Sequence, residues 1–282
     1  MGALRRMASD DEDEEGGVEK DIIETDPSDL ADTKSLVEEI IPADIRSKYD
    51  VVSYRKAAAV LRAGHPAEFE EILQALRDFT IALEMIRRPG GNESKIVKRM
   101  TAALRPLGWN ETTVQGDLLI RLQWAEKPAG KGKAQKQVKT YWRRNFLDGH
   151  KIDFVKGRVA FDFEWNSKDQ TFDRDLYAFR AFSEAGAIDV AVIVTRSASL
   201  NPVFKELGQA LDRDGKPKFA NGKPMMLAAK YGASTTWWGK LIYRLNAGRN
   251  GGCPVLVFGI RPECISDLDA WRAGAHHSAA EL

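Results

Sequence analysis

Two almost uninterrupted apolar runs constrain the fold of this chain more than any other feature. They are AIDVAVIVT at 187–195 and CPVLVFGI at 253–260. A strand with one face in water alternates apolar and polar residues, whereas a strand that is apolar at nearly every position is buried on both faces. A sheet containing such strands needs a layer of helices on each side. The runs therefore predict an α/β architecture with a mixed central sheet flanked by helices.

The pattern between and before these runs supports the same architecture. Apolar residues at helical spacing and the positions of glycine and proline divide the chain into elements. We expect helices at 66–88 and at 93–104, the second capped by Asn92. Further helices are expected at 172–184, 202–211 and 235–248, and further strands at 116–124, 150–155 and 158–165.

Charge is distributed unevenly along the chain. The 282 residues hold 42 Lys and Arg against 41 Asp and Glu, but the first 30 contain three of the former and eleven of the latter. Residues 31–282 therefore carry a net charge of +9. The segment 1–30 has too little apolar surface to fold and is predicted to be an acidic, disordered leader. The rest is predicted to be one domain at 31–282, with a helical N-terminal part (31–110) and an α/β core at about 116–262.

Several classes of protein are disfavoured by composition. No run approaches the roughly 18 apolar residues of a membrane span, and no secretory signal is recognisable. The two cysteines are too few for a disulfide framework or a cysteine-based zinc site. A soluble cytoplasmic protein is predicted. Its basic body is suited to a polyanion, although a basic surface also serves solubility alone.

The most unusual stretch is KIDFVKGRVAFDFEWNSKDQ, at 151–170. Alternation along a strand places Phe161, Phe163 and Trp165 on one face and the oxygen-bearing side chains of Asp162, Glu164 and Asn166 on the other. A short turn, KGR, separates this strand from the preceding one. An antiparallel partner would therefore bring Asp153 alongside Asp162.

Carboxylates held this close repel one another, and a divalent cation such as Mg²⁺ would remove the conflict. A plainer alternative is an exposed edge strand whose acids pair with Lys151, Lys156 or Arg158. A metal site beside a basic surface favours phosphodiester hydrolysis, in which a metal activates water and stabilises charge on the phosphate.

Three stretches resemble type II restriction endonucleases of the BamHI and BglII kind, whose fold is the PD-(D/E)xK nuclease core. They are IDFVKGRVAFDFEW, FDRDLYAF with GAIDVAVIVTR, and GGCPVLVFGI, which together cover about residues 150–260. The resemblance implies a restriction-endonuclease-like core and Mg²⁺-dependent, sequence-specific double-strand cleavage of DNA, leaving 5′-phosphate and 3′-hydroxyl ends. It also implies that Mn²⁺ substitutes for Mg²⁺ and that the enzyme is a homodimer.

The resemblance assigns the metal and catalytic roles to Asp153, Asp162 and Glu164. Most of the superfamily has lysine at the third position, so Glu164 is either a metal ligand or a general base. A rival register takes Glu164 as the second acid and Asn166 as the third member. Glu93 is the candidate for the fourth acid that some members add from an upstream helix.

Sequence-specific cleavage needs side chains in the major groove, and the resemblance implies that they come from the loops that follow the catalytic strand and precede later helices. The candidates are Asn166, Ser167, Lys168, Arg196, Ser199, Asn201, Ser234, Thr235 and Thr236. Each could instead be a helix cap or a loop residue. Lys127, Lys131, Lys133, Lys136 and Lys139 are expected to contact phosphates, or else to belong to a solvated linker. Two other interpretations remain: a nuclease for repair, recombination or defence, and a DNA-binding module without activity.

Overall fold

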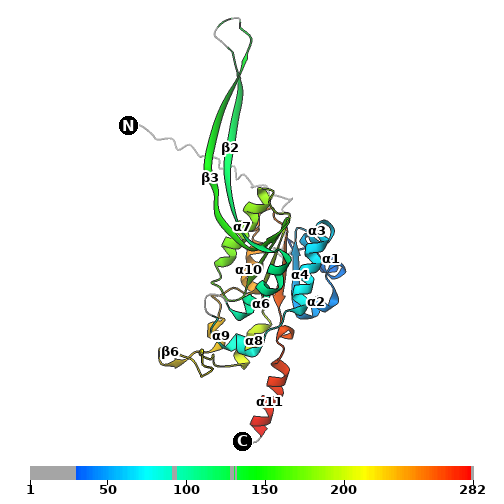
Figure 1. Cartoon of the computed structure of the whole chain (residues 1–282), viewed down its shortest axis with the longest axis vertical. Coiled ribbons are helices and arrows are strands. Elements are labelled where there is room, and N and C mark those ends of the chain that lie inside the picture. Colours follow the sequence, from blue (N-terminus) through cyan, green and yellow to red (C-terminus); the bar gives the residue numbers. More distant parts are fainter. Residues whose placement is uncertain (1–29, 91–93, 128–129, 131, 281–282) are drawn as a thin grey trace, which may run out of the picture.

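A mixed six-stranded sheet forms the centre of the protein (Figure 1). The computed structural model describes residues 30–90, 94–127, 130 and 132–280. The strand order is β1-β8-β5-β4-β3-β2. Three inner strands, β4, β5 and β8, run parallel, and each of the others runs antiparallel to its neighbour. The strands are β1 (Tyr49–Tyr54), β2 (Asn110–Glu126), β3 (Gln135–Lys156), β4 (Val159–Glu164), β5 (Val190–Arg196) and β8 (Val255–Ile260).

Helices cover both faces of this sheet. The apolar side chains of α7 and α10 form one core with one sheet face, and helices from the rest of the chain form a second core with the other. The predicted α/β fold with a flanked mixed sheet is therefore confirmed. The helices are α1 (Lys34–Ile40), α2 (Ala43–Lys48), α3 (Ala57–Gly64), α4 (Pro66–Asp78), α5 (Leu83–Arg87), α6 (Lys95–Leu104), η2 (Arg105–Leu107), α7 (Thr171–Glu184), α8 (Leu200–Glu206), α9 (Leu227–Lys230), α10 (Trp238–Asn246), η3 (Pro262–Cys264) and α11 (Leu268–Ala280).

The predicted long helix at 66–88 is wrong, because the chain leaves helical geometry after Asp78. Phe79 is extended, with ψ 124°. The peptide N–H of Ile81 donates to Cys264 O at 2.8 Å, and the N–H of Ser266 donates to Ile81 O at 3.0 Å. This pairing with a distant segment takes the place of helical hydrogen bonds, so two helices, α4 and α5, replace one.

Two further expectations for the N-terminal part need correction. The helix predicted at 93–104 begins at Lys95, where the Ser94 hydroxyl caps it by accepting from Val97 N at 3.2 Å. Asn92 and residues 1–29 of the predicted leader 1–30 lie outside the described residues. The part predicted to be helical also contributes a strand, β1, which pairs with β8 along its full length. In the part of the chain that the structure describes, no helix has the length and apolarity to cross a membrane.

The other large difference from expectation is an arm formed by the outer parts of β2 and β3, at 116–147. These strands, of 17 and 22 residues, continue as a twisted two-stranded ribbon well beyond the body (Figure 1). The sequence predicted only a strand at 116–124, followed by lysines that contact phosphates or belong to a solvated linker. In the structure Lys136 already belongs to β3, where it pairs with Ala125. The predicted linker is therefore the end of a long hairpin.

Candidate functional site

The predicted pairing of Asp153 with Asp162 is present. Gly157, with φ +54°, lies in the turn that joins β3 to β4, and Phe154 pairs with Phe161 across the two strands. The peptide N–H of Asp153 donates to Asp162 Oδ1 at 2.7 Å. The peptide N–H of Phe163 in turn lowers the pKa of Asp153 by donating to its carboxylate. Asp153 and Asp162 therefore lie side by side.

The alternative of an exposed edge strand is excluded. β4 lies between β3 and β5, and Asp162 and Glu164 are only 3% and 7% exposed. The three cations considered as their partners bind other acids: Lys151 pairs with Glu111, Lys156 with Glu71 and Arg158 with Asp189.

A fourth carboxylate, Asp175, joins the group from α7. It is 2% exposed and receives a hydrogen bond from Arg174 at 3.2 Å on Oδ1. The sequence analysis did not select it. The available signal was its position: Asp175 lies three residues after Phe172 and four before Phe179, on the apolar face of the helix. A charge on that face is unusual enough to mark a site.

Burial and mutual repulsion raise the pKa values of these acids. Burial raises the pKa of Glu164 to about 8, with a further contribution from Asp175. The pKa of Asp162 lies well above its ordinary value, first because of burial and then because of Asp175 and Asp153. Burial raises the pKa of Asp175 to about 7 against the opposing effect of Arg174. The pKa of Asp153 moves in the same upward direction, again mainly from burial. We call Asp153, Asp162, Glu164 and Asp175 the acid cluster.

The acid cluster contains oxygens that lack hydrogen-bond partners. They are Asp162 Oδ2, Glu164 Oε2 and Asp175 Oδ2, all buried. Buried polar atoms are normally paired, so oxygens of this kind call for an unseen proton or cation. Among the residues described, no three His, Cys, Asp or Glu side chains are arranged so that they could already hold a metal ion. The donor set therefore fits a hard divalent cation by its chemistry, but the side chains do not yet form a coordination shell.

The acid cluster predicts an unusual pH dependence of stability in metal-free protein. Its folded-state pKa values are raised, so the folded protein binds protons that the unfolded chain releases. Stability is then greatest below the unfolded values and is lost as pH rises through the folded values of about 7 for Asp175 and about 8 for Glu164. Each extra proton contributes up to about 1.4 kcal/mol per pH unit. Thermal melts in EDTA should show Tm falling as the buffer is changed from mildly acidic to mildly alkaline.

Glu164→Gln and Asp175→Asn should each flatten this dependence, because each removes one of the groups concerned. Asp148→Asn is the matched control, since Asp148 is exposed and outside the acid cluster. A wild-type Tm that rises over the same pH range would contradict the assignment of these pKa directions.

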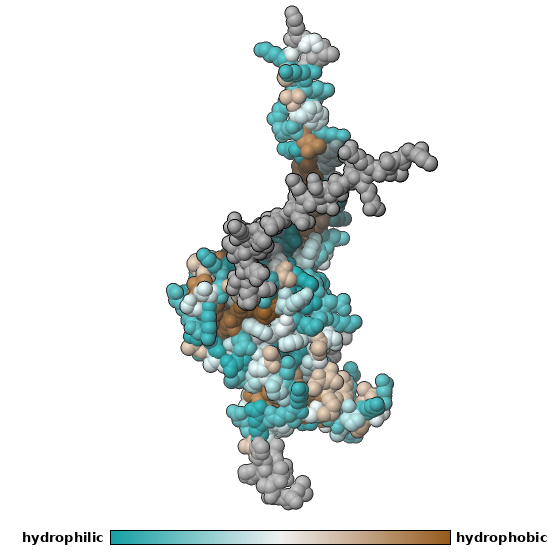
Figure 2. Space-filling model, turned by 180° about the vertical axis from the view of Figure 1, so that it is seen from behind, coloured by the Kyte–Doolittle hydropathy of each residue, from teal (hydrophilic) through white to brown (hydrophobic). Residues whose placement is uncertain are grey.

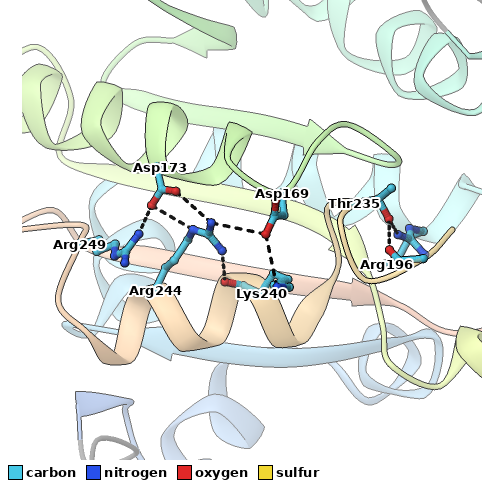
Figure 3. Close-up of polar contacts among 8 residues, drawn as sticks. Asp169, Asp173, Arg196, Thr235, Lys240, Arg244 and Arg249 are labelled. Carbon is cyan, nitrogen blue, oxygen red and sulfur yellow. Dashed lines mark hydrogen bonds and ion pairs between the residues drawn. The ribbon is translucent and has the colours of Figure 1, made fainter.

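Ion pairs fasten α7, which carries Asp175, to α10 (Figure 3). Arg244 donates to Asp173 from Nε at 3.0 Å and from Nη2 at 2.9 Å, and Arg249 also binds Asp173. Asp169, just before α7, pairs with Lys240 at 3.4 Å. The hydrogen bond from Arg244 is the main reason why the pKa of Asp173 is lowered. These contacts fix the beginning of α7 over the sheet.

The predicted DNA-contact loops at 166–168 and 234–236 meet beside the acid cluster. Ser167 N donates to Thr236 Oγ1 at 3.1 Å, and Thr236 N donates to Ser167 O at 2.8 Å. Lys168 forms a backbone bridge with Thr235. Ser167, Lys168 and Ser234 are exposed on this short ribbon, whereas Thr236 is fully buried. The prediction that Thr236 contacts DNA is therefore wrong for this arrangement; its hydroxyl holds the two loops together.

Arg196 is also interior, which contradicts its predicted contact with a base edge. Its side chain is 0% exposed. Nε donates to Trp165 O at 2.7 Å, and Nη2 donates to Thr235 Oγ1 at 2.6 Å and to Thr236 O at 2.8 Å. Figure 3 shows the contact with Thr235. Arg196 thus joins the end of β5 to both loops. The sequence could not separate a buried arginine from a DNA-binding one.

A cavity of about 310 Å³ opens next to the acid cluster. Asp153, Glu164 and Asn166 line it together with Lys230. Asn166 Oδ1 is buried without a partner, which keeps Asn166 eligible as the third member in the rival register. Lys230 was not selected from the sequence. Its Nζ donates to Ile86 O and Arg88 O at 2.7 and 2.6 Å, and burial lowers its pKa to about 8.

The remaining predicted residues lie elsewhere or are not described. Ser199 is exposed at the start of α8 and shares a hydrogen bond with Ser197 at 2.8 Å. Asn201 lines a separate cavity with Phe204 and Trp237. Lys133 is exposed at the far end of the arm. Glu93 and Lys131 lie outside the described residues.

A comparison with protein families agrees with this arrangement. The family model described as restriction endonuclease BglII/BglIII matches residues 49–260. The match runs from β1 to β8 and so includes every strand of the central sheet and all four members of the acid cluster. No curated protein matches the chain. With three quarters of its length covered, the chain belongs to the BglII/BglIII family of restriction endonucleases.

Proposed function

We propose that this protein is a type II restriction endonuclease that makes Mg²⁺-dependent, sequence-specific double-strand cuts in DNA. The observation that carries the proposal is the acid cluster: buried carboxylates with unpartnered oxygens, on the fold of a restriction-endonuclease family and beside an open cavity. A cluster of this kind is costly to bury without a cation. A cation that binds together with DNA would offset this free-energy cost of burial.

In this proposal Asp153 and Asp162 hold the cation, and Mn²⁺ can take its place. The bound cation would lower the pKa of water and offset negative charge on the phosphate. Glu164 fits a general base by its position, because it lines the cavity together with Asp153 and a carboxylate there could accept a proton from the attacking water. It fits equally as a third ligand. Asp175 and Arg174 support these residues from α7, where the two side chains form an ion pair at 3.2 Å.

The residues imply a simple course for the reaction. Glu164 accepts a proton from the attacking water, and the water oxygen forms a bond to phosphorus. The bond from phosphorus to the 3′ oxygen breaks in line, and that oxygen takes up a proton from solvent water, which leaves a 5′-phosphate and a 3′-hydroxyl. Ser167, Lys168 and Ser234, exposed on the ribbon beside the acid cluster, are the nearest candidates for contacts with base edges. A palindromic recognition site would be cut by a two-fold symmetric homodimer.

Digestion of DNA of known sequence with Mg²⁺ tests this function directly. We expect discrete fragments whose ends map to one short sequence, carry 5′-phosphates, and disappear with EDTA. Progressive degradation would instead indicate a nuclease with a repair, recombination or defence task. Retention of DNA on a gel without any strand breaks would indicate a silent binding module. Either of these two outcomes would overturn the proposal.

A further inference from the structure

The described residues of the arm (116–127, 130 and 132–147) are exposed on both faces and along most of its edges. β3 pairs with β4 only over Phe154 to Lys156, so its outer part pairs with β2 alone. A two-stranded ribbon is at best marginally stable in water without a covering layer. Eight large apolar side chains are at least 36% exposed on it: Leu119, Ile120, Leu122, Trp124, Val138, Tyr141, Trp142 and Phe146. Figure 2 shows hydrophobic patches between hydrophilic ones along the arm.

Cations are interleaved with these apolar side chains. Residues 116–147 contain eight Lys and Arg but only two Asp and Glu. None of the described cations among them is in an ion pair with a described residue. Three instead lie over rings of the arm itself: Lys139 over Tyr141 at 5.2 Å, Arg144 over Trp142 at 5.0 Å and Arg143 over Phe146 at 5.5 Å.

This combination favours a polyanion over another protein surface. Two copies of the arm would each bring a net charge of +6 to a shared interface, which electrostatics opposes. A polyanion neutralises the same charge and gains entropy by releasing its counterions. A two-stranded β-ribbon also has the width of the major groove of B-DNA, and apolar side chains find surfaces on the bases.

The cross-strand register sorts the cations onto two faces. Leu122 pairs with Lys139 and Leu118 with Arg143, and side chains directly opposite each other share a face. The alternate positions, Arg121 opposite Thr140 and Lys136 opposite Ala125, point to the other face. Two of these four cations therefore lie on each face, which allows the faces to be tested separately.

The position of the arm separates it from the cleavage site. From Asp153 to Lys139, β3 runs 14 residues, on the order of 45 Å at about 3.3 Å per residue. That length corresponds to roughly 13 base pairs of B-DNA. Side chains at this distance cannot read the base pairs held at the acid cluster. They can reach only DNA that flanks the recognition site.

Given the proposed function, we infer that the arm is a clamp that grips duplex DNA flanking the cleavage site, through phosphate contacts and exposed aromatic side chains. Contacts of this kind position and retain the enzyme without specifying bases. The clamp adds affinity for long DNA while the loops near the acid cluster set the sequence.

Two double variants and one quadruple variant test the clamp. Lys139→Gln with Arg143→Gln removes the cations of one face, and Arg121→Gln with Lys136→Gln removes those of the other. On a duplex of about 40 base pairs with a central site, the quadruple variant should bind at least roughly tenfold more weakly near physiological salt. The slope of log affinity against log salt should fall by about 0.9 for each phosphate that the variant no longer neutralises.

A duplex of about 14 base pairs with a central site extends only about 24 Å to each side, too short to reach the four substituted cations, and should bind the quadruple variant and wild type within about twofold. The matched control is Lys34→Gln with Arg62→Gln, two exposed cations near the opposite edge of the sheet. It should leave both affinities unchanged.

The outcomes distinguish the clamp from its alternatives. If either double variant binds the 40-base-pair duplex more weakly than wild type does, the clamp is supported. Unchanged binding by the quadruple variant, while wild type still cuts DNA, overturns it. If the quadruple variant loses affinity equally for the long and the short duplex, the arm does not bind the DNA that flanks the site. If shortening the arm to a tight turn halves the mass in sedimentation but leaves DNA affinity intact, the arm is an interface between copies of this chain, which also overturns the clamp. Absence of cleavage by wild type would instead count against the proposed function.

Discussion

Replacing Asp162 with asparagine will reduce DNA cleavage by on the order of a thousandfold and leave DNA binding intact. The substitution keeps the acceptor for Asp153 N, because Oδ1 is retained. It replaces the unpartnered Oδ2 with an amide nitrogen, which cannot ligate a cation, and it removes the negative charge. Removing one electrostatic contact to a transition state typically costs a factor of about 10² to 10³, and removal of a metal ligand lies at the upper end.

A second measurement on the same variant separates catalysis from folding. Asp162 is buried beside the carboxylates of Asp175 and Asp153, and both its burial and their negative charge raise its pKa. Asp162→Asn should therefore raise the Tm of metal-free protein in mildly alkaline buffer, even as cleavage disappears. Asp148→Asn, on the exposed part of β3, should change neither quantity. Cleavage within about tenfold of wild type by the Asp162 variant would show that the acid cluster is not the catalytic site.

Replacing Arg196 with alanine will destabilise the protein by about 3 to 5 kcal/mol, because it removes a large buried side chain together with its hydrogen bonds. The change leaves the carbonyls of Trp165 and Thr236 without their donors and opens a cavity against Phe204 and Tyr231. At about 2 to 4 °C per kcal/mol, Tm should fall by roughly 10 °C. Differential scanning calorimetry measures this shift.

Two further substitutions show what Arg196 contributes. Arg196→Lys keeps the charge but cannot make the three strong hydrogen bonds to both loops, so it should forfeit most of the same stability. Arg249→Gln is the control, because Arg249 is a 43% exposed cation paired with Asp173 and should cost less than about 1 kcal/mol. If Arg196→Ala has the same Tm as wild type, Arg196 does not organise the loops.

The fold was predictable where physical constraints are local. The apolar runs that became β5 and β8 could only be buried on both faces, and the turn between β3 and β4 brought Asp153 to Asp162. Helix α7 lies at its expected place for the same reason, since its apolar spacing is regular. The break after Asp78 was not predictable, because it depends on the pairing of Ile81 with Ser266, 185 residues away.

Long-range packing also explains the missed parts of the site. Asp175 had a signal in the sequence, its place on the apolar face of α7, but its proximity to Asp162 and Glu164 follows only from the packing of α7 on the sheet. Arg196 and Thr236 were selected for side chains suited to base edges, but burial turned the same donors and acceptors inward. The arm was predicted only in part. Its strands pack against no core, so apolar and polar residues do not alternate along them. Its function depends on a binding partner, which the sequence does not contain.

A crystal structure of the protein with a duplex containing its site, soaked in Mn²⁺, tests the central claim most directly. The anomalous signal of manganese identifies the ion without ambiguity. We predict an anomalous peak bound by Asp153 and Asp162, with Glu164 in its shell or facing the phosphate. A complex with DNA seated over the cavity, no peak between these side chains, and their oxygens satisfied by protons alone would contradict the account.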